Sequence, residues 1–396
     1  MYFKLTDEQN AVREAARDFA QIELLPGVIE RDINMAYPKD EVQKMSEMGF
    51  MGMMVDPKYG GGGMDTLSYV LAMEEISKID SSCSVIMSVN NSLVCWGIET
   101  YGTEEQKQKY LPKLTSGEWI GSYCLSEPEA GSDATSQRTT AIDKGDHYLL
   151  NGTKNWITNG GTSSLHIVIA QSDIEAGYRG INAFIVEADW EGVTIGAKED
   201  KLGIRASDTH TIMYSDVKVP KENRIGEDGF GFKFAMKVLS GGRIGIAAQA
   251  LGIAAGSYEL SVAYSKEREA FGKAISKHQA IAFKLADMAT DVEAARLLVY
   301  RSAWLKDQGQ DYSTASSMAK LFASEVAMKH TVEAVQIHGG YGYVKEYHVE
   351  RLMRDAKITQ IYEGTSEIQR IVLSRSILKG QLYQPIWQLE SNGVGS

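Results

Sequence analysis

The chain has 396 residues, of which 43% are hydrophobic and 23% are charged, and its formal net charge is −11. This length can bury a large core and predicts two or three domains. The acidic balance argues against non-specific binding to nucleic acid or to anionic membranes. The three cysteines, Cys83, Cys95 and Cys124, form no CxxC pair and no metal-ligand spacing. Neither a metal site nor a disulfide framework is therefore indicated, and a reducing compartment is expected.

The N-terminus predicts a helix and no targeting segment. Thr6 and Gln9 have the Thr-x-x-Gln spacing of a capping box at the start of a predicted helix over residues 5–20. That start leaves no room for a signal or transit peptide. No run reaches the roughly eighteen consecutive apolar residues of a membrane-spanning helix, since the small-residue stretch 244–256 is shorter. A cytoplasmic protein is expected.

Residues 1–119 form a predicted N-terminal helical domain, with helices expected over 5–20, 65–78 and 104–114. Between the first two lies a run of four glycines, Gly60 to Gly63, which we interpret as a flexible connector. A phosphate-binding loop would need Gly-Lys-Ser or Gly-Lys-Thr next, and Met64-Asp65 follows instead.

Residues 120–228 change in character and predict a middle domain of β structure. Short β-rich runs bounded by Gly, Asn, Asp or Pro occur at residues 148–150, 165–170, 183–186 and 211–219. Helical periodicity is missing from this part of the sequence. The spacing of the runs favours a compact antiparallel β domain.

Residues 229–380 predict a C-terminal four-helix bundle. The clearest helix has an apolar 4-3-4-3-4 spacing, typical of a bundle seam, at Ile281, Leu285, Met288, Val292, Ala295 and Val299. Further helices are expected over 243–265 and 312–337, the latter ended by Gly339-Gly340. Gly229-Phe230-Gly231 lacks the third glycine of a nicotinamide-binding Rossmann fingerprint. Residues 381–396 are expected to be a weakly ordered tail, and the fold class is α+β, mainly α.

The stretch 361–369, Ile-Tyr-Glu-Gly-Thr-Ser-Glu-Ile-Gln, places Glu363 between an aromatic residue and a glycine, just before a predicted helix. Ser366 and Gln369 have the Ser-x-x-Gln spacing of a capping box. A carboxylate on such a turn, beside the positive end of a helix, can abstract a proton or contribute to an anion site. Taken alone, a solvated helix cap is the more common outcome.

Two stretches of the middle region suit a planar heterocycle. The first, residues 125–133, is a loop with hydroxyls and a glycine, and the second is Trp156-Ile157-Thr158-Asn159. A flat, hydrogen-bonding ring could stack on Trp156 and bond to Ser126 and Thr158. The alternative is a turn followed by a core tryptophan.

Three stretches of the C-terminal region carry further candidates. Arg268 and Phe271 lie in Arg-Glu-Ala-Phe-Gly, with Gln279 shortly after, and Gln336 precedes the glycine pair. Arg243 ends Leu-Ser-Gly-Gly-Arg. Individually these are also consistent with solvated surface charges and a helix C-terminus.

Together, and in the same order along the chain, these motifs resemble those of acyl-CoA dehydrogenases, from about Leu5 to Lys379. The resemblance implies the acyl-CoA dehydrogenase fold, with FAD as cofactor. The FAD-binding positions that it implies are Tyr123, Leu125, Ser126, Ser132, Trp156, Ile157, Thr158, Arg268, Phe271, Gln279, Gln336, Gly339, Gly340, Thr365 and Glu367.

The resemblance also assigns parts of the cofactor to particular residues. Trp156 would pack beside the isoalloxazine ring, and Thr158 would donate near N5, which stabilises the reduced flavin. Arg268 would pair as a fork with the pyrophosphate. Gly339 and Gly340 would let the FAD of a neighbouring subunit approach the backbone, so that the cofactor site is shared between chains.

By the same resemblance, Glu363 is the catalytic base that removes the pro-R α proton of the acyl thioester. Its own N–H and a ribityl hydroxyl of FAD would bond the thioester oxygen, while the β-hydride passes to flavin N5 and leaves trans-2-enoyl-CoA. Burial should raise the pKa of Glu363 towards neutrality. Glu367 is the rival base, ranked lower because it falls inside the predicted helix.

Substrate contacts implied by the resemblance are Ser132, Ser240, Arg243, Tyr362 and Gly364. Many relatives carry Asp where this chain has Ser240, so a carboxylate beside Arg243 is missing here. The stretches 88–93, 198–205 and 283–288 look most like short-chain (butyryl-CoA) members of the family.

The function implied is oxidation of short straight-chain acyl-CoA in fatty acid β-oxidation, with electrons passed to an electron-transferring flavoprotein. A homotetramer built as a dimer of dimers is expected. Three alternatives stay open: an enoyl-CoA reductase running the same chemistry in reverse, a non-catalytic FAD or acyl-CoA binding protein, and a flavin monooxygenase or acyl-CoA oxidase of related fold.

Overall fold

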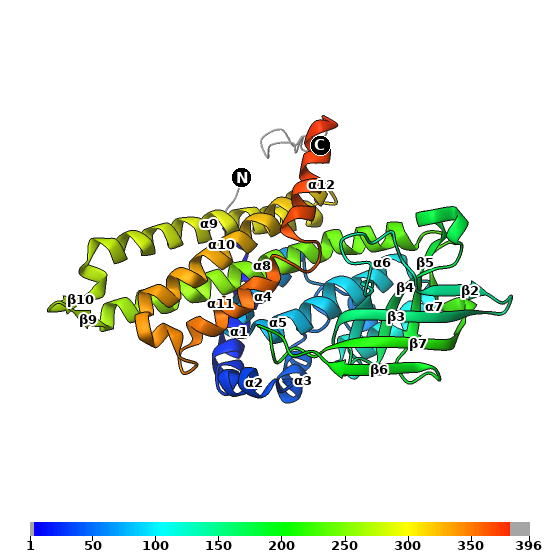
Figure 1. Cartoon of the computed structure of the whole chain (residues 1–396), viewed down its shortest axis with the longest axis horizontal. Helices are drawn as coiled ribbons and strands as arrows, with labels where there is room; N and C mark the ends of the chain where they lie inside the picture. Colours follow the sequence, from blue (N-terminus) through cyan, green and yellow to red (C-terminus); the bar gives the residue numbers. More distant parts are fainter. Residues whose placement is uncertain (1–3, 381–396) are drawn as a thin grey trace.

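A computed structural model describes residues 4–380, and Figure 1 shows helices at the N-terminal part, a sheet at one end and long helices across the molecule. The N-terminal helices are α1 (Asp7–Phe19), α2 (Val28–Asn34), α3 (Lys39–Glu47), α4 (Thr66–Ile79), α5 (Ser81–Ser88), α6 (Trp96–Tyr101) and α7 (Glu104–Thr115). The predicted capping box at Thr6 is confirmed, because its side chain accepts from Gln9 N while the Gln9 side chain accepts from Thr6 N. Short α2, α3, α5 and α6 were not predicted.

The four-glycine segment is a packed turn, so its interpretation as a flexible connector is wrong. Gly62 N donates to Gly52 O at 2.9 Å and Gly63 N donates to Val55 O at 2.8 Å. A Cβ atom on Gly61 would lie 2.1 Å from Val55 O. Glycine is required here because two backbone segments touch, which the composition of the segment alone does not reveal.

The sheet has strand order β6-β7-β3-β2-β4-β5-β8, with β1 paired to β4. Its strands are β1 (Gly121–Cys124), β2 (Thr140–Asp143), β3 (His147–Thr158), β4 (Leu165–Gln171), β5 (Ile181–Glu187), β6 (Val193–Lys198), β7 (Thr209–Pro220) and β8 (Arg224–Ile225). The predicted antiparallel pairing holds for β3 with β7 and for β4 with β5. The prediction is wrong for β1, which pairs in parallel with β4, and for Thr140, the first residue of β2, which also pairs in parallel with β4.

Strand β4 is buried along its whole length because it has a core on each side. Ile167 and Ile169 belong to a cluster with Phe234 of α8, and Val168 belongs to a cluster with Ile212 of β7. The sheet is therefore anchored to the long helix that also runs through the rest of the molecule.

The C-terminal helices are α8 (Gly231–Glu267), α9 (Gln279–Asp307), α10 (Ser313–His338), α11 (His348–Thr359) and α12 (Ser366–Leu378), with a hairpin of β9 (Glu269–Ala270) and β10 (Lys273–Ala274). The predicted seam of α9 is buried from Met288 to Val299, whereas Ile281 and Leu285 are partly buried. The helix predicted over 243–265 begins twelve residues earlier, at Gly231. The predicted tail, 381–396, lies outside the described residues.

Helix α8 is the centre of the largest core, which it shares with α4, α9 and α10. By length and composition it could cross a membrane, yet 89% of its most apolar window is buried inside the protein. Close approach explains its glycines: a Cβ atom on Gly252 would lie 2.4 Å from Glu74 O in α4. Burial of this kind is typical of the core helix of a folded domain.

Candidate active site

Glu363 lies in the short turn that joins α11 to α12. Its φ of 53° and the φ of 93° at Gly364 are both left-handed, which costs a non-glycine residue roughly 1–2 kcal/mol. The predicted capping box of Ser366 and Gln369 is wrong, because Thr365 is the N-cap and its side chain accepts from Ile368 N. Gln369 instead donates to Glu363 O at 3.3 Å and to Gly364 O at 2.9 Å, so it braces the turn.

The Glu363 carboxyl points into the protein against the glycine pair of α8. Its Oε2 atom is buried and has no hydrogen-bond partner among the described residues, 4–380. A Cβ atom on Gly242 would lie 2.1 Å from that oxygen, so the carboxyl occupies space that any other residue at 242 would fill. Burial raises the pKa of Glu363 to about 7, against a smaller opposing effect of the charges of Lys320 and Arg243.

Two buried cations accompany this carboxyl. Arg243 is 6% exposed; its guanidinium donates to Ser317 Oγ at 3.3 Å, its Nε has no partner, and burial lowers its pKa. Lys320 of α10 donates from Nζ to Gly364 O at 2.6 Å, and burial lowers its pKa to about 8. The sequence singled out Arg243 but missed Lys320, which looks like any lysine in an amphipathic helix.

Tyrosines form the rest of the surroundings. Tyr123 of β1 is partly buried, and its buried Oη has no partner among residues 4–380. Burial raises its pKa, and the negative charge of Glu363 adds to the effect. Tyr362 donates to Gln249 Oε1, and Tyr69 donates to Ser88 Oγ at 3.1 Å. Glu363 Oε2, Arg243 Nε and Tyr123 Oη are thus buried polar atoms without a partner in the described chain, which is how a site for a polar ligand appears when the ligand is not there.

Trp156 is held at the surface by a bulge in β3. The pairing of β3 with β7 shifts register between Lys154 and Ile157, and Trp156 has a φ of 61°. The indole is 63% exposed while Ile157 is buried. The alternative of a core tryptophan is therefore wrong, and the exposed ring is a platform on which a flat group can stack.

A buried ion pair fixes the loop beside that platform. Lys154 Nζ lies 2.7 Å from Glu127 Oε1, and the two side chains are 0% and 3% exposed. Glu127 also accepts from Arg138 N and Thr139 N, at 2.6 Å and 3.0 Å. Ser126 O accepts from Asn155 N at 2.9 Å, so the predicted loop and the bulge are neighbours, whereas sequence reasoning missed Lys154 and Glu127.

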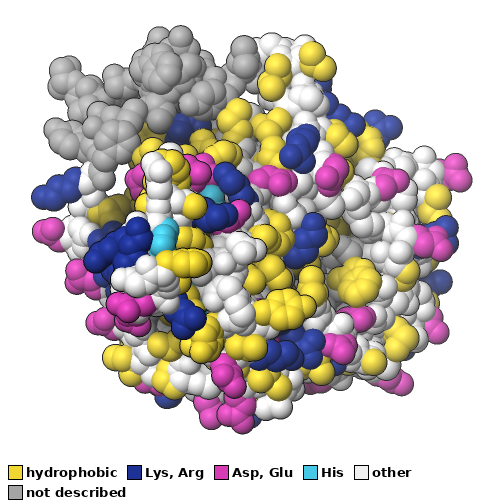
Figure 2. Space-filling view, turned by 60° about the vertical axis from the view of Figure 1, so that its left-hand side comes forward, with side chains coloured by type: hydrophobic (Ala, Val, Ile, Leu, Met, Phe, Trp, Pro, Cys, Tyr) yellow, Lys and Arg dark blue, Asp and Glu magenta, His cyan; other side chains and the backbone are white. Residues whose placement is uncertain are grey.

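The remaining cofactor candidates meet at another place, a hollow at the far end of α10. Arg268, Gly339 and Gly340 line it together with Tyr264 and Tyr341, and the Arg268 guanidinium lies 5.5 Å from the centre of the Tyr341 ring. Gln336, Gln279 and Phe271 do not line it but are exposed and lie within four residues of Ile337 or Ile275, which do. The space-filling view, which brings the hairpin end of the molecule forward, shows hydrophobic side chains interspersed with basic and acidic ones (Figure 2).

Phe271 is the most exposed of these residues. It is 94% exposed at the tip of the β9–β10 hairpin, where it and Gly272 have φ values of 53° and 75°. Gly339, the C-cap of α10 at this hollow, comes nineteen residues after Lys320, which is about 28 Å at the rise of an α-helix. Within one chain the two groups of candidates are therefore far apart.

Family models of the acyl-CoA dehydrogenase N-terminal, middle and C-terminal domains match residues 6–118, 122–217 and 229–378. The chain belongs to the acyl-CoA dehydrogenase family. A relative from Clostridium acetobutylicum named "Acyl-CoA dehydrogenase, short-chain specific" is 50% identical over 379 residues, covering 96% of this chain and 100% of that protein.

Solved structures agree with this acyl-CoA dehydrogenase assignment. Butyryl-CoA dehydrogenase from Megasphaera elsdenii is 49% identical with a TM-score of 0.94, covering 96% of this chain and all of that one. A chain in a structure described as "Electron transferring flavoprotein of Acidaminococcus fermentans: Towards a mechanism of flavin-based electron bifurcation" is 51% identical with a TM-score of 0.95, over 96% and 100% of the two chains.

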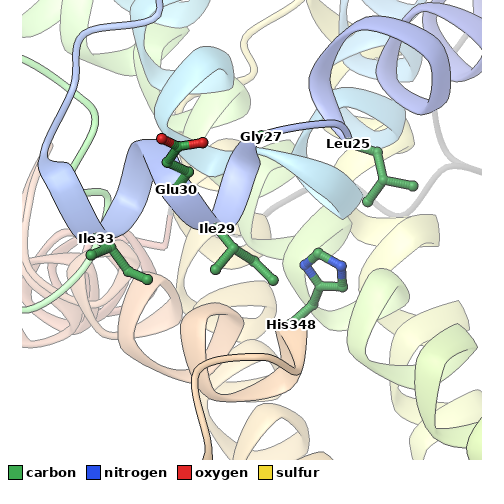
Figure 3. Close-up of a pocket in the computed structure, with 6 residues that line it drawn as sticks. All are labelled: Leu25, Gly27, Ile29, Glu30, Ile33 and His348. Carbon is green, nitrogen blue, oxygen red and sulfur yellow. The ribbon is translucent and has the colours of Figure 1, made fainter.

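As an acyl-CoA dehydrogenase, the chain is an oxidoreductase that acts on CH–CH bonds with FAD. The structure fits this cofactor: an exposed indole at a bulge can take a flat ring, and the arginine of the far hollow can take a phosphate. Figure 3 shows a further hollow between α2 and α11, lined by Leu25, Gly27, Ile29, Glu30, Ile33 and His348. It contains none of the residues that the sequence singled out.

Four predicted residues of the acyl-CoA dehydrogenase site lie apart from the buried carboxyl or have other partners. Glu367 is exposed on the first turn of α12, Thr365 caps that helix, and Ser132 is exposed in its loop. Ser240 Oγ donates within α8 to Met236 O at 2.9 Å. Of the two candidate bases, Glu363 has a buried carboxyl oxygen, whereas Glu367 is exposed to solvent.

Proposed function

We propose that this acyl-CoA dehydrogenase oxidises short straight-chain acyl-CoA to trans-2-enoyl-CoA, with Glu363 as the base that removes the α proton. The observation that carries the proposal is the buried, unpartnered Oε2 of Glu363. A carboxyl whose pKa lies near 7 can be ionised at neutral pH and still accept a proton from a weak carbon acid. Glu367 is exposed and is not proposed as the base.

The surroundings of Glu363 serve that proton transfer. Arg243 and Lys320 favour the ionised carboxylate, while the tyrosines exclude water and keep the dielectric low. The backbone N–H of Glu363 has no acceptor among residues 4–380, so it can donate to the thioester oxygen as negative charge develops there. A lost donor of this kind typically costs roughly 10²- to 10³-fold in rate.

Other chain residues are proposed to hold the ligands. Tyr123, Leu125, Ser126, Trp156, Ile157 and Thr158 would hold the flavin end of FAD, with Thr365 and Glu367 near it. FAD supplies the acceptor for the β-hydrogen and its electrons. Ser132 and Ser240 would contact the CoA part, whereas buried Arg243 is placed better for the thioester end together with Tyr362 and Gly364.

The proposal includes a homotetramer with FAD sites shared between chains. The separation of about 28 Å, estimated along α10, supports the shared sites. At that distance the hollow with Arg268 and the glycine pair is not adjacent to Glu363 of the same chain. The hollow, with Phe271, Gln279 and Gln336 beside it, would receive the adenine half of a neighbour's FAD.

The relatives support the substrate and the partner. A short-chain-specific relative and a butyryl-CoA dehydrogenase favour butyryl-CoA, and the Acidaminococcus structure favours an electron-transferring flavoprotein as electron acceptor. A role in fatty acid β-oxidation follows from that substrate. A cytoplasmic location is supported by three buried, unpaired cysteines, since reduced thiols suit a reducing compartment.

The proposal is tested by mixing the purified holoprotein with butyryl-CoA under anaerobic conditions and following flavin absorbance. Wild-type protein should bleach, and Glu363→Gln should retain FAD but bleach roughly 10²- to 10⁴-fold more slowly, the usual cost of a missing base. Glu367→Gln is the matched control and should bleach at a rate close to the wild type.

Three results would count against the proposal. Undiminished bleaching of Glu363→Gln would remove Glu363 from its role, and a wild-type protein that stays yellow would indicate a binding protein. Rapid reoxidation when oxygen is admitted would indicate an oxidase. Repeating the measurement across acyl chain lengths tests the short-chain preference.

A further inference from the structure

We propose that Lys320 is a positioning residue for the catalytic base: its ammonium clamps the Glu363–Gly364 turn and supplies part of the charge that keeps Glu363 ionised. This inference rests on the proposed function of Glu363. It adds a residue that the sequence motifs do not contain, since Lys320 lies on α10, more than forty residues before the turn.

The clamp is visible in the hydrogen bonds of Gly364 O. Lys320 Nζ donates to this oxygen at 2.6 Å from α10, and Gln369 Nε2 donates to it at 2.9 Å from α12. The turn contains a left-handed Glu363, a conformation that persists only where the surroundings hold it. Two donors from two helices on one carbonyl provide that restraint.

The charge of Lys320 has no dedicated carboxylate partner. Lys320 is 0% exposed, and its ammonium donates to a backbone carbonyl and forms no ion pair in the described part of the chain. Burying a lysine ammonium costs free energy unless another group pairs with its charge or hydrogen-bonds to it. The charges around it are those of Arg243 and of three carboxylates, Glu363, Glu325 and Glu367. Among these carboxylates, Glu363 is the one with a buried oxygen that has no partner in the described chain.

Titratable groups approach Glu363 from each element packed against it. Arg243 comes from α8, Lys320 from α10, Tyr123 from β1 and Tyr69 from α4. The two cations lower the pKa of Glu363 against the effect of burial. The tyrosines are uncharged at neutral pH, and burial raises their pKa values further from it. Removal of Lys320 would therefore leave Arg243 as the remaining cation beside the carboxyl.

The test compares Lys320→Gln with Lys320→Arg, Gln369→Leu and a control on the same helix, Lys329→Met. Lys320→Gln removes the charge, Lys320→Arg keeps it, and Gln369→Leu loosens the turn without changing any charge. Lys329 is 60% exposed at its side chain and pairs with Asp291, so its loss should change nothing. If Lys320→Gln fails to fold, Lys320→Met replaces it, because an unbranched apolar side chain can fill much of the buried space that the lysine stem occupies.

The readouts are the pH dependence of anaerobic flavin reduction and the titration of the Glu363 carboxyl, followed by ¹³C NMR of glutamate-labelled protein. Lys320→Gln should move both midpoints up by about one pH unit, as expected when a nearby opposite charge is removed. The reduction rate at pH 6.5 should fall about tenfold. Lys320→Arg should keep the wild-type midpoints, and Gln369→Leu should lower the rate at every pH without moving them.

The proposal would be overturned if Lys320→Gln kept the wild-type pH midpoints of reduction and of the Glu363 titration. This holds even if the reduction rate or the stability of the variant fell. A shift of equal size in Lys329→Met would also overturn it. Failure of the proposed function shows itself separately, since wild-type protein would then not be bleached by butyryl-CoA, while the NMR titration would still report the effect of Lys320 on Glu363.

Discussion

Gly242→Ala should disable the proposed base without touching it chemically. The added methyl group would lie 2.1 Å from Glu363 Oε2 and 2.6 Å from Leu93 Cδ2. Both separations are far below ordinary van der Waals contact of about 3.5 Å or more. Since α8 is fixed by the central core, the Leu93 side chain and the Glu363 carboxyl must both move, the carboxyl by about an ångström or more.

The size of the effect follows from that displacement. A reacting group misplaced by about 1 Å costs roughly 10²-fold in rate, so the rate of anaerobic bleaching by butyryl-CoA should fall by about two orders of magnitude. Stability should change less. Alanine favours a helix over glycine by about 1 kcal/mol, and overpacking opposes this by roughly 1–3 kcal/mol.

Gly241→Ala is the matched control for this prediction. It adds the same methyl group one residue earlier in α8, where the nearest atom, Lys306 Nζ, would lie 3.7 Å away. Stopped-flow bleaching, FAD content and thermal unfolding are measured for both variants. Near wild-type bleaching in Gly242→Ala would refute the placement of the carboxyl, and an equal loss in Gly241→Ala would show that the damage is to the helix in general.

Three further outcomes are expected. Lys154→Met should lower the free energy of unfolding in urea by about 3–5 kcal/mol, because it leaves Glu127 charged and buried without its partner; a loss below 1 kcal/mol would contradict this. Trp156→Ala should hardly change thermal stability, since the indole is 63% exposed, but should weaken FAD binding about tenfold by loss of stacking, measured by flavin release on dilution. Glu363→Gln should be more stable than wild type above pH 7: burial raises the folded pKa to about 7 from a model-compound value of 4.5, so the native state holds an extra proton between these values and loses stability as pH rises through them. The gain in melting temperature should shrink to nothing below pH 4.5, and a pH-independent gain would argue against a raised pKa.

Helices with strong local signals were predictable, while elements formed by tertiary contact were not. Thr6 and Gln9 identified the start of α1 through a capping box, and the spacing of apolar residues identified α9. Strands β1 and β8, in contrast, are four and two residues long and exist because β4 and β5 offer edges to pair with. No local pattern in so short a segment distinguishes a strand from a loop.

The cap at α12 was misassigned by one residue for a physical reason. Thr365 and Ser366 are both good N-cap residues, so the Ser-x-x-Gln spacing was a plausible box. The structure makes Thr365 the cap because Gly364 can adopt the left-handed conformation that turns the chain before it. Gln369 does not cap the helix and instead donates to the carbonyls of Glu363 and Gly364.

Two of the site residues that escaped prediction, Lys154 and Lys320, are lysines buried by elements distant in sequence. In the sequence Lys154 lies between polar residues of a strand, and Lys320 lies in an Ala-rich helix, so both are interpreted as solvated charges. In the fold both ammonium groups are 0% exposed, and they are held by carbonyl or carboxylate oxygens of other segments. Burying such a charge is costly unless other groups pair with it or hydrogen-bond to it. Lys154 holds the loop beside Trp156, and Lys320 holds the turn of Glu363, so the buried cations mark the two irregular segments on which the proposed chemistry depends.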